Sequence, residues 1–271
     1  MDRILPNEDT RGLLANIKCF ALDMDGTFYL GDNLIPGSTD FLEKLHRCGR
    51  SFIFLTNNSS KSRSAYLEKL TNMGVIIDKR QLVTSGQATV EYLRREHPAK
   101  RVFLLGNPVL TQEFLEGGIT LDDKNPDIAI TAFDTTLDYE KMCKICDFVR
   151  AGIPYIATHP DYNCPTDSGY IPDIGAIHAF IHASTGRMPD YIIGKPYAEI
   201  MRCALSQAGY KAEETAMVGD RLYTDIALCE NIPGITGILV LSGESTPDDV
   251  KNAKVKPHLI FDNLASIAKL I

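Results

Sequence analysis

The sequence predicts an α/β fold in which helices cover both faces of a parallel sheet. Three observations point to it: short apolar runs recur along the chain, segments with apolar residues at helical spacing separate them, and glycines stand where several of these segments end. Strand, helix and strand repeated in this order form a parallel sheet within three α/β/α layers. The 271 residues suffice for one large domain or two modest ones.

The first repeat of this pattern lies near the start of the chain. Cys19–Leu22 and Phe52–Leu55 are continuous apolar runs, as expected of strands that are buried on both faces. Between them, the apolar residues of Phe41–Cys48 fall on one helical face, and Gly49 follows as a stop. A second helix is predicted for Ser62–Met73, and it too ends before a glycine.

The middle and the end of the chain continue the same pattern. Apolar runs predict the strands Val102–Leu105, Ile128–Ala132, Tyr155–Ala157, Ala216–Val218, Ile238–Leu241 and Leu259–Phe261. Helical spacing predicts the helices Ala88–Glu96, Tyr139–Arg150 and Tyr197–Ala208. His159–Pro172 is rich in proline and aspartate and interrupts the pattern, so we expect a loop there.

Charge and composition exclude several classes of protein. With 28 basic and 35 acidic residues the net charge is −7, which disfavours nucleic acid and anionic membranes as main partners. No apolar run reaches the roughly 18 residues of a membrane span. The polar stretch Met1–Thr10 lacks the layout of a signal peptide, so we expect a soluble, cytoplasmic protein.

Two patterns that resemble metal sites are weak. Cys143 and Cys146 form a C-x-x-C in a predicted helix with no second pair nearby, which favours helix packing over zinc or redox chemistry. His178 and His182 stand four apart in another predicted helix, but Ala179 occupies the place where a zinc protease has glutamate. We expect both histidines to be partly exposed helix residues.

The first candidate for chemistry is the pair Asp23 and Asp25. The pair follows directly after the predicted strand Cys19–Leu22, and Gly26 allows a sharp turn behind it. Ligands bind at the carboxyl ends of strands in open α/β sheets, and two such carboxylates can hold Mg²⁺ or divide nucleophilic and acid–base work. A polar turn after a strand would also account for these residue types.

Three further clusters stand at predicted strand ends. Thr56–Ser60 offers short hydrogen-bonding side chains and backbone N–H groups that could hold an anion. Lys195 lies between a strand and a helix start, where it can neutralise charge, and Asp220 and Asp225 follow the strand Ala216–Val218. Each cluster alone is explained by capping, turn or surface chemistry. Their shared position in one sheet is the stronger signal.

The motifs together resemble the haloacid dehalogenase superfamily, in the branch of NagD and the p-nitrophenyl phosphatases. The matching segments, which span residues 23 to 226, read D-M-D-G-T-F-Y-L-G, L-T-N-N-S-S, A-T-H-P-D-Y-N-C-P-T, I-G-K-P and G-D-R-L-Y-T-D-I. They stand in the order that the family has. The match is specific for the family and does not identify a substrate.

The resemblance implies roles for the matching residues. Asp23 would attack phosphorus and form an aspartyl-phosphate, and Asp25 would protonate the leaving oxygen and then activate water. Mg²⁺ would be held by the Asp23 carboxylate, the backbone carbonyl of Asp25 and Asp220, with Asp225 supporting. The phosphate-binding residues would be Thr56, Asn57, Asn58 and Lys195. An anionic nucleophile facing a phosphate dianion needs such cations to offset repulsion.

The resemblance also implies two domains. The 139 residues from Thr56 to Lys195 exceed what one helix connection needs. We therefore expect a core with the Rossmann-like haloacid dehalogenase fold at 1–82 and 187–271, and an inserted α/β cap domain at 83–186. Within the cap, the residues expected to face the leaving group are His159, Asp161, Tyr162, Asn163 and Cys164. An ordinary surface loop is the alternative for this segment.

The function predicted from these features is a Mg²⁺-dependent phosphatase acting on small phosphomonoesters such as p-nitrophenyl phosphate and sugar or nucleotide monophosphates. Two alternatives stay open. A phospho-ligand sensor could use the same fold without catalysis, but such a sensor could dispense with Asp23 or Asp25, and both are present. A phosphotransferase could pass the phosphoryl group to an alcohol instead of water. The sequence leaves the physiological substrate and the oligomeric state open.

Overall fold

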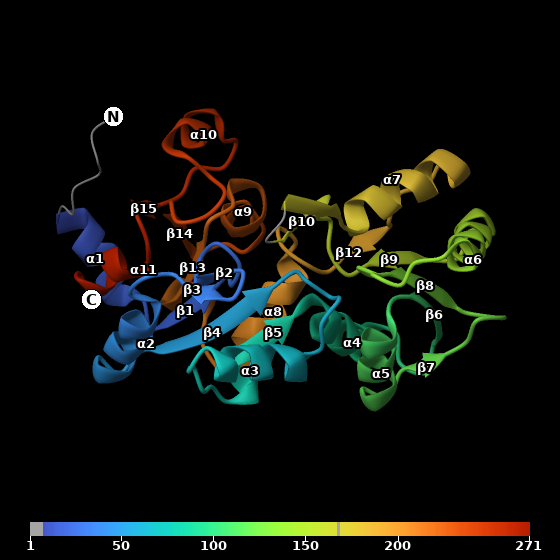
Figure 1. Cartoon of the computed structure of the whole chain (residues 1–271), viewed down its shortest axis with the longest axis horizontal. Coiled ribbons are helices and arrows are strands. Elements are labelled where there is room, and N and C mark those ends of the chain that lie inside the picture. The colour runs from blue at the N-terminus through green and yellow to red at the C-terminus, as the bar shows by residue number, and fades with distance from the viewer. Residues whose placement is uncertain (1–7, 167–168) are drawn as a thin grey trace. The chain divides into compact units, whose positions relative to one another are not determined.

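A computed structural model describes residues 8–166 and 169–271, which form two compact units (Figure 1). The first unit comprises the chain up to Thr56, Leu67–Val83 and Lys195–Ile271, and the second comprises Asn57–Tyr66 and Thr84–Gly194. Compared with the expected division, the second unit gains residues 57–66 and 187–194 and loses Val83. The reason is that the chain after residue 56 bonds within the second unit and that residues 191–192 pair with its sheet.

The first unit is built on a six-stranded sheet in the order β15-β14-β13-β1-β4-β5. Its strands are β1 (Cys19–Leu22), β4 (Ser51–Thr56), β5 (Leu82–Thr84), β13 (Thr215–Gly219), β14 (Thr236–Val240) and β15 (Leu259–Phe261). The central strand β1 runs parallel to both β13 and β4, with Leu22 opposite Val218 and Phe54. All four of its residues are buried, which is why the continuous apolar run predicts it correctly.

Helices and short turns complete the first unit. These are α1 (Glu8–Asn16), α2 (Ser38–Arg47), α8 (Ala198–Ala208), α9 (Leu228–Asn231), α10 (Pro247–Asn252), α11 (Leu264–Ala268), the 3₁₀ turns Lys79–Gln81 and Ala212–Glu214, and the π-helical turn Leu222–Ile226. A small hairpin joins β2 (Tyr29–Leu30) and β3 (Asn33–Leu34), and α3 (Arg63–Asn72) runs from one unit into the other. Phe41 of α2 packs edge-on against Phe20 of β1, with ring centroids 5.4 Å apart.

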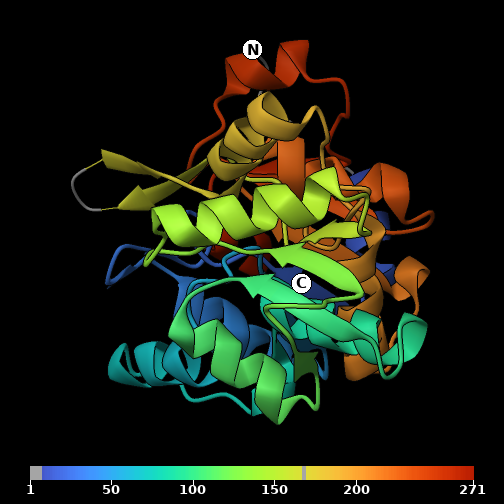
Figure 2. The ribbon, with the colours of Figure 1, turned by 90° about the vertical axis from the view of Figure 1, so that its right-hand side faces the viewer.

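The second unit has its own five-stranded sheet in the order β12-β9-β8-β6-β7. Its elements are α4 (Ser85–Glu96), β6 (Arg101–Leu105), α5 (Pro108–Glu116), β7 (Thr120–Leu121), β8 (Ile128–Thr131), α6 (Tyr139–Arg150), β9 (Tyr155–Ala157), α7 (Ile174–Thr185) and β12 (Tyr191–Ile192). All the pairings are parallel. Helices α6 and α7 cover one face of this sheet and α4 and α5 the other (Figures 1 and 2). Both units therefore have the predicted α/β architecture.

Within the segment expected to be a loop, the structure has an antiparallel hairpin of β10 (Asn163–Thr166) and β11 (Gly169–Pro172). Its residues are exposed or half-buried, and Figure 2 shows the two strands extending from the rest of this unit. The hairpin has no apolar run because it joins neither of the large sheets, so periodicity could not reveal it.

One side-chain expectation is wrong. His178 is 2% exposed and not partly exposed, because it faces the sheet and shares a 2.9 Å hydrogen bond between its Nε2 and the Thr131 hydroxyl. His182, four residues later, is exposed as predicted. In α6, Cys143 is exposed and Cys146 is buried in the core, and both are free thiols.

Among the helices of residues 8–166 and 169–271, none has the length and the apolar content that crossing a bilayer requires. The first seven residues of the polar stretch Met1–Thr10 lie outside the described residues.

Candidate active site

Two aspartates stand at the carboxyl ends of neighbouring parallel strands in the first unit. Asp23 follows β1, and its backbone N–H donates to the carbonyl of Val218 in β13 at 2.9 Å. Asp220 follows β13 directly. Because β1 and β13 are paired in parallel, their ends meet at one edge of the sheet, and this brings the two carboxylates together.

A third carboxylate and a lysine complete an acidic cluster. Oxygens of Asp23, Asp220 and Asp225 lie within 4.8 Å of one another. Lys195 donates from Nζ to Asp23 Oδ1 at 2.5 Å, to Asp225 Oδ1 at 2.7 Å and to the carbonyl oxygen of Leu55 at 3.1 Å. Lys195 is 2% exposed and Asp225 is fully buried. We call Asp23, Asp220, Asp225 and Lys195 the acidic cluster.

Burial and mutual repulsion shape the electrostatics of the cluster. Burial, followed by the charges of Asp23 and Asp225, raises the pKa of Asp220 well above its ordinary value. Burial acts to lower the pKa of Lys195, but the carboxylates of Asp225 and Asp23 outweigh it and hold that pKa above normal. The Lys195 ammonium and the Arg221 guanidinium thus act on three carboxylates. An oxygen-only donor set with excess negative charge fits a hard divalent cation.

Backbone and side-chain donors hold Asp220 in place. Its Oδ2 accepts from the Glu244 N–H at 2.7 Å, and the Thr27 hydroxyl lies 3.5 Å from Oδ1. Gly26 packs against the same carboxylate with a φ of +85°, and a Cβ at this position would collide with the Asp220 side chain. Any residue but glycine would therefore displace an aspartate of the cluster.

Asp25 is not one of the three clustered carboxylates. Tyr29 donates from its hydroxyl to Asp25 Oδ2 at 3.3 Å, and the Gly26 N–H donates to the Tyr29 carbonyl at 2.8 Å. Asp25 is also half-buried, whereas Asp23 is 9% exposed. The two aspartates of the D-x-D motif thus have different environments, as a division of roles requires.

The predicted phosphate-binding residues fall in both units. Thr56 ends β4 in the first unit and is buried, as is Lys195. Asn57 and Asn58 belong to the second unit. There Asn57 Nδ2 donates to Asp161 Oδ1 at 3.0 Å, and Asn58 Oδ1 accepts from both the backbone and the hydroxyl of Ser60 at 2.8 Å. The structure brings Lys195 to Asp23 and Asn57 to Asp161.

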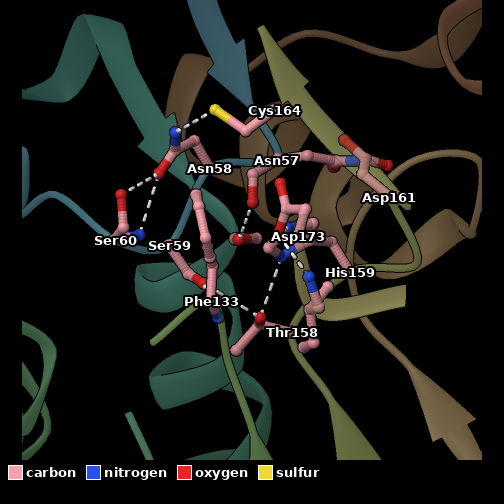
Figure 3. A network of polar contacts seen from close by, with 12 residues as sticks. Asn57, Asn58, Ser59, Ser60, Phe133, Thr158, His159, Asp161, Cys164 and Asp173 are labelled. Carbon is pink, nitrogen blue, oxygen red and sulfur yellow. Dashed lines mark hydrogen bonds and ion pairs between the residues drawn. The ribbon is translucent and has the colours of Figure 1, made fainter. Parts of the chain in front are cut away.

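The predicted cap-loop residues differ in exposure. His159 is fully buried, and its ring nitrogens contact Thr158 and Asp173 (Figure 3). Asp161 is 8% exposed. Tyr162 is 61% exposed, Asn163 is exposed, and Cys164 is half-buried with its sulfur 3.7 Å from Asn58 Nδ2. The outward part of the segment is therefore the start of the hairpin.

Two residues near the cluster were missed at the sequence level. Arg221 Nε lies 2.9 Å from Glu244 Oε2, and the Arg221 backbone N–H donates to Asp225 Oδ2 at 3.1 Å. Arg221 follows Asp220 directly, so its place in the G-D-R-L-Y-T-D segment was a usable signal. Glu244 lies in a loop after β14 and has no local pattern that would reveal it.

Comparison with family models gives two matches, one in the first half of the chain and one in its last third. Residues 20–120 match a model described as haloacid dehalogenase-like hydrolase. Residues 192–267 match a second model, described as HAD-hydrolase-like. The first match contains Asp23, Asp25 and Thr56, and the second contains Lys195 and Asp220.

Individual relatives match this chain over almost its whole length. An acid sugar phosphatase of Staphylococcus aureus is 36% identical over 255 residues, which is 93% of this chain and 98% of that protein. The crystal structure of 4-nitrophenylphosphatase from Thermotoga maritima is 49% identical with a TM-score of 0.91, covering 95% of this chain and 98% of the other. NagD from E. coli K-12 is 34% identical with a TM-score of 0.85, covering 94% and 99%. Relatives named as phosphatases favour an enzyme over a sensor.

Proposed function

Since this chain belongs to the haloacid dehalogenase-like hydrolases and is a phosphomonoesterase related to NagD and the p-nitrophenyl phosphatases, we propose that it hydrolyses small phosphomonoesters with Mg²⁺ through an aspartyl-phosphate at Asp23. The observation that carries this proposal is the acidic cluster at the carboxyl edge of the first sheet. It combines a nucleophile, a buried ammonium and excess negative charge in one place.

Asp23 is the proposed nucleophile. Its carboxylate stands next to the end of β1, and Lys195 donates to Oδ1. Attack by a carboxylate oxygen on phosphorus forms a new P–O bond as the bond to the leaving oxygen breaks. The buried ammonium offsets the repulsion between this anion and the incoming phosphate, and the Asp23 side chain is held in one orientation before the substrate arrives.

Asp25 is the proposed acid and base. In its protonated form it gives a proton to the leaving oxygen, and as a carboxylate it then takes a proton from the water that cleaves the aspartyl-phosphate. The second step releases inorganic phosphate and returns both aspartates to their starting states. The Tyr29 hydroxyl donates to Asp25 Oδ2, which orients this side chain.

The residues that would hold Mg²⁺ are Asp23 and Asp220 through their carboxylates and Asp25 through its backbone carbonyl, with Asp225 supporting. A bound divalent cation would supply positive charge that the single ammonium of Lys195 cannot, and so would favour the negatively charged transition state. Asp225 keeps Lys195 in position by accepting a hydrogen bond from its Nζ at 2.7 Å. The role of Asp225 therefore does not depend on direct contact with the metal.

Phosphate binding is proposed for Thr56, the backbone of Asn57 and Lys195, while Asn58 shapes the loop through its contacts with Ser60. Selection of the leaving group is proposed for the start of the β10–β11 hairpin, at the exposed Tyr162 and Asn163 and the half-buried Cys164. A tyrosine face and an amide suit the stacking and hydrogen bonding that sugars and nucleosides offer.

The experiment is a panel of phosphomonoesters: p-nitrophenyl phosphate, sugar phosphates, nucleoside monophosphates and glycerol phosphate. Each is assayed with Mg²⁺ and after exhaustive chelation, and again with a small alcohol added as an acceptor. We expect release of inorganic phosphate that disappears on chelation and returns with Mg²⁺. Full activity in the chelated enzyme would refute the metal assignment. Phosphate transferred mainly to the alcohol would instead indicate a phosphotransferase.

A further inference from the structure

The chain passes between its two units at four points, and we call two of them, Thr56–Asn57 and Gly194–Lys195, the crossings. The residue on the first-unit side of each crossing, Thr56 or Lys195, is a proposed phosphate ligand. In the first unit the two segments are adjacent, since Lys195 donates to the Leu55 carbonyl at 3.1 Å. Each crossing therefore continues directly into the proposed phosphate site.

The other ends of these crossings meet inside the second unit. A Cβ built on Gly194 would lie 2.6 Å from Asn57 Oδ1, 2.6 Å from the His159 Cβ and 2.8 Å from the Thr158 carbonyl oxygen. The backbone N–H of Gly194 donates to that same carbonyl at 2.8 Å. Such close approach leaves no room for a side chain, so the backbone at Gly194 is packed directly onto Thr158 and the loop after β4.

A buried row of hydrogen bonds ties this loop to Thr158 (Figure 3). The Ser59 hydroxyl lies 3.1 Å from the Thr158 hydroxyl, which lies 2.9 Å from His159 Nδ1. On the other side of the ring, His159 Nε2 lies 3.0 Å from Asp173 Oδ1. Ser59, Thr158 and His159 are fully buried, and Asp173 is 3% exposed. We call these four residues the crossing network.

The hydrogen bonds of the crossing network all point the same way along the row. Asp173 accepts from His159 Nε2. In a neutral imidazole the other ring nitrogen is an acceptor, so Nδ1 then accepts from the Thr158 hydroxyl. Thr158 accepts in turn from the Ser59 hydroxyl, and Ser59 accepts from the backbone N–H of Phe133 at 3.0 Å. Every hydroxyl both donates and accepts, so each buried group is satisfied. A fully satisfied buried network is rigid, and losing one member leaves its neighbours unpaired.

We propose that the crossing network is a positioning device that holds the Thr56–Asn57 and Gly194–Lys195 crossings side by side and thereby sets the spacing of Thr56 and Lys195 for the phosphoryl group. This inference rests on the proposed phosphate-binding role of those two residues. It assigns His159 a positioning role within its own unit, in place of contact with the leaving group. The anchor is Asp173, which caps α7 by accepting from the Ile174 N–H at 2.6 Å.

The chain offers a matched pair of variants to test this. Thr158→Val and Thr131→Val each remove one fully buried hydroxyl that bonds a buried histidine at 2.9 Å, with little change of volume. Only Thr158 also bonds Ser59 and so reaches the crossings. Thr158→Ser restores the hydroxyl. For each variant we measure the melting temperature, kcat and KM for p-nitrophenyl phosphate, and the inhibition constant of inorganic phosphate.

We expect the melting temperature to fall by a similar amount in both valine variants. Thr158→Val should raise KM and the phosphate inhibition constant roughly five- to tenfold, the scale of one lost buried hydrogen bond. For Thr131→Val, KM and the phosphate inhibition constant should stay within about twofold of the wild-type values. Thr158→Ser should recover most of the affinity that Thr158→Val loses. If the wild type is active but both valine variants bind phosphate equally well, the positioning role is overturned alone. A wild type that hydrolyses no phosphomonoester overturns the proposed function and the positioning role together.

Discussion

Lys195 is the residue on which the charge balance of the acidic cluster depends. Its ammonium contacts Asp23 and Asp225, and it is almost completely buried. The carboxylates keep its pKa above normal although burial acts the other way, so Lys195 stays charged across the physiological pH range. Without it, three carboxylates would face one another with no ammonium among them.

We predict that Lys195→Ala lowers kcat/KM for p-nitrophenyl phosphate on the order of 10²–10³-fold, because a preorganised cationic contact to the reacting group is lost. The matched control is Lys141→Ala, which removes a lysine paired with Asp134 at 2.7 Å in the second unit. Rates are normalised to the folded fraction measured by circular dichroism. Near wild-type kinetics in Lys195→Ala would exclude this lysine from the reaction.

The two aspartates of the D-x-D motif should be separable. Asp23→Asn removes the proposed nucleophile and should abolish both turnover and any covalent phosphate adduct. The activity of Asp25→Asn should fall most on alkyl phosphates, whose leaving groups need a proton, and less on p-nitrophenyl phosphate. Because water attack also needs Asp25, phosphoenzyme should accumulate in Asp25→Asn from the aryl substrate.

Intact-protein mass spectrometry after rapid quenching with p-nitrophenyl phosphate distinguishes these outcomes. An adduct on Asp23→Asn, or equal losses on alkyl and aryl substrates in Asp25→Asn, would show that the two roles are assigned wrongly.

At the scale of a single element, helix α7 contains a buried and an exposed histidine. His178 faces the sheet and His182 faces solvent. Burial, with a smaller effect of the neighbouring His159, lowers the pKa of His178 to about 3. An unfolded histidine has a pKa near 6.5. Between these values the unfolded chain binds a proton at this position that the folded chain does not, so acid favours unfolding there.

The free energy of unfolding should therefore fall as the pH drops below about 6.5. For His178 alone, the loss between pH 7 and pH 5 is about 2 kcal/mol. We predict that His178→Gln flattens this part of the pH profile, measured by urea unfolding at each pH. His182→Gln, on the same helix, should leave the slope as it is in the wild type. Equal slopes in all three proteins would mean that His178 is not held neutral by the fold.

At the scale of the whole chain, the acidic cluster joins segments that are far apart in sequence. Asp23 and Asp220 are separated by 197 positions, and Lys195 comes from a third segment. The cluster exists only when the first unit is folded, so a cation that binds it must stabilise the folded state. Repulsion among buried carboxylates has the opposite effect when no cation is bound.

We predict that Mg²⁺ at tenfold its dissociation constant stabilises the protein by about 1.4 kcal/mol and raises its melting temperature. Asp220→Asn should melt higher than the wild type in chelator, because an amide avoids the folding cost of a carboxyl whose pKa burial raises, and should gain less from Mg²⁺. Scanning calorimetry with and without the ion measures both effects. A wild-type melting temperature that does not change when Mg²⁺ is added would contradict the proposed site.

Local sequence patterns determined most of the sheet framework. A strand buried on both faces needs an unbroken apolar run, and Cys19–Leu22 and Tyr155–Ala157 have the predicted boundaries. Because the ends of parallel strands meet at one edge, the positions of Asp23 and Asp220 after such runs were enough to place them together. The hairpin Asn163–Pro172 was missed because its residues are not packed in a sheet core and so carry no apolar period.

The sequence by itself determined the α/β class, the family and the candidate residues, because these depend on local periodicity and on motifs of a few residues. Only the tertiary structure decided that Lys195 contacts both Asp23 and Asp225, and that His159 is buried against Asp173. These contacts depend on how segments distant in sequence pack and on which polar groups lose access to water. No local pattern encodes that exclusion of water, since it arises only when the whole unit has closed around the side chain.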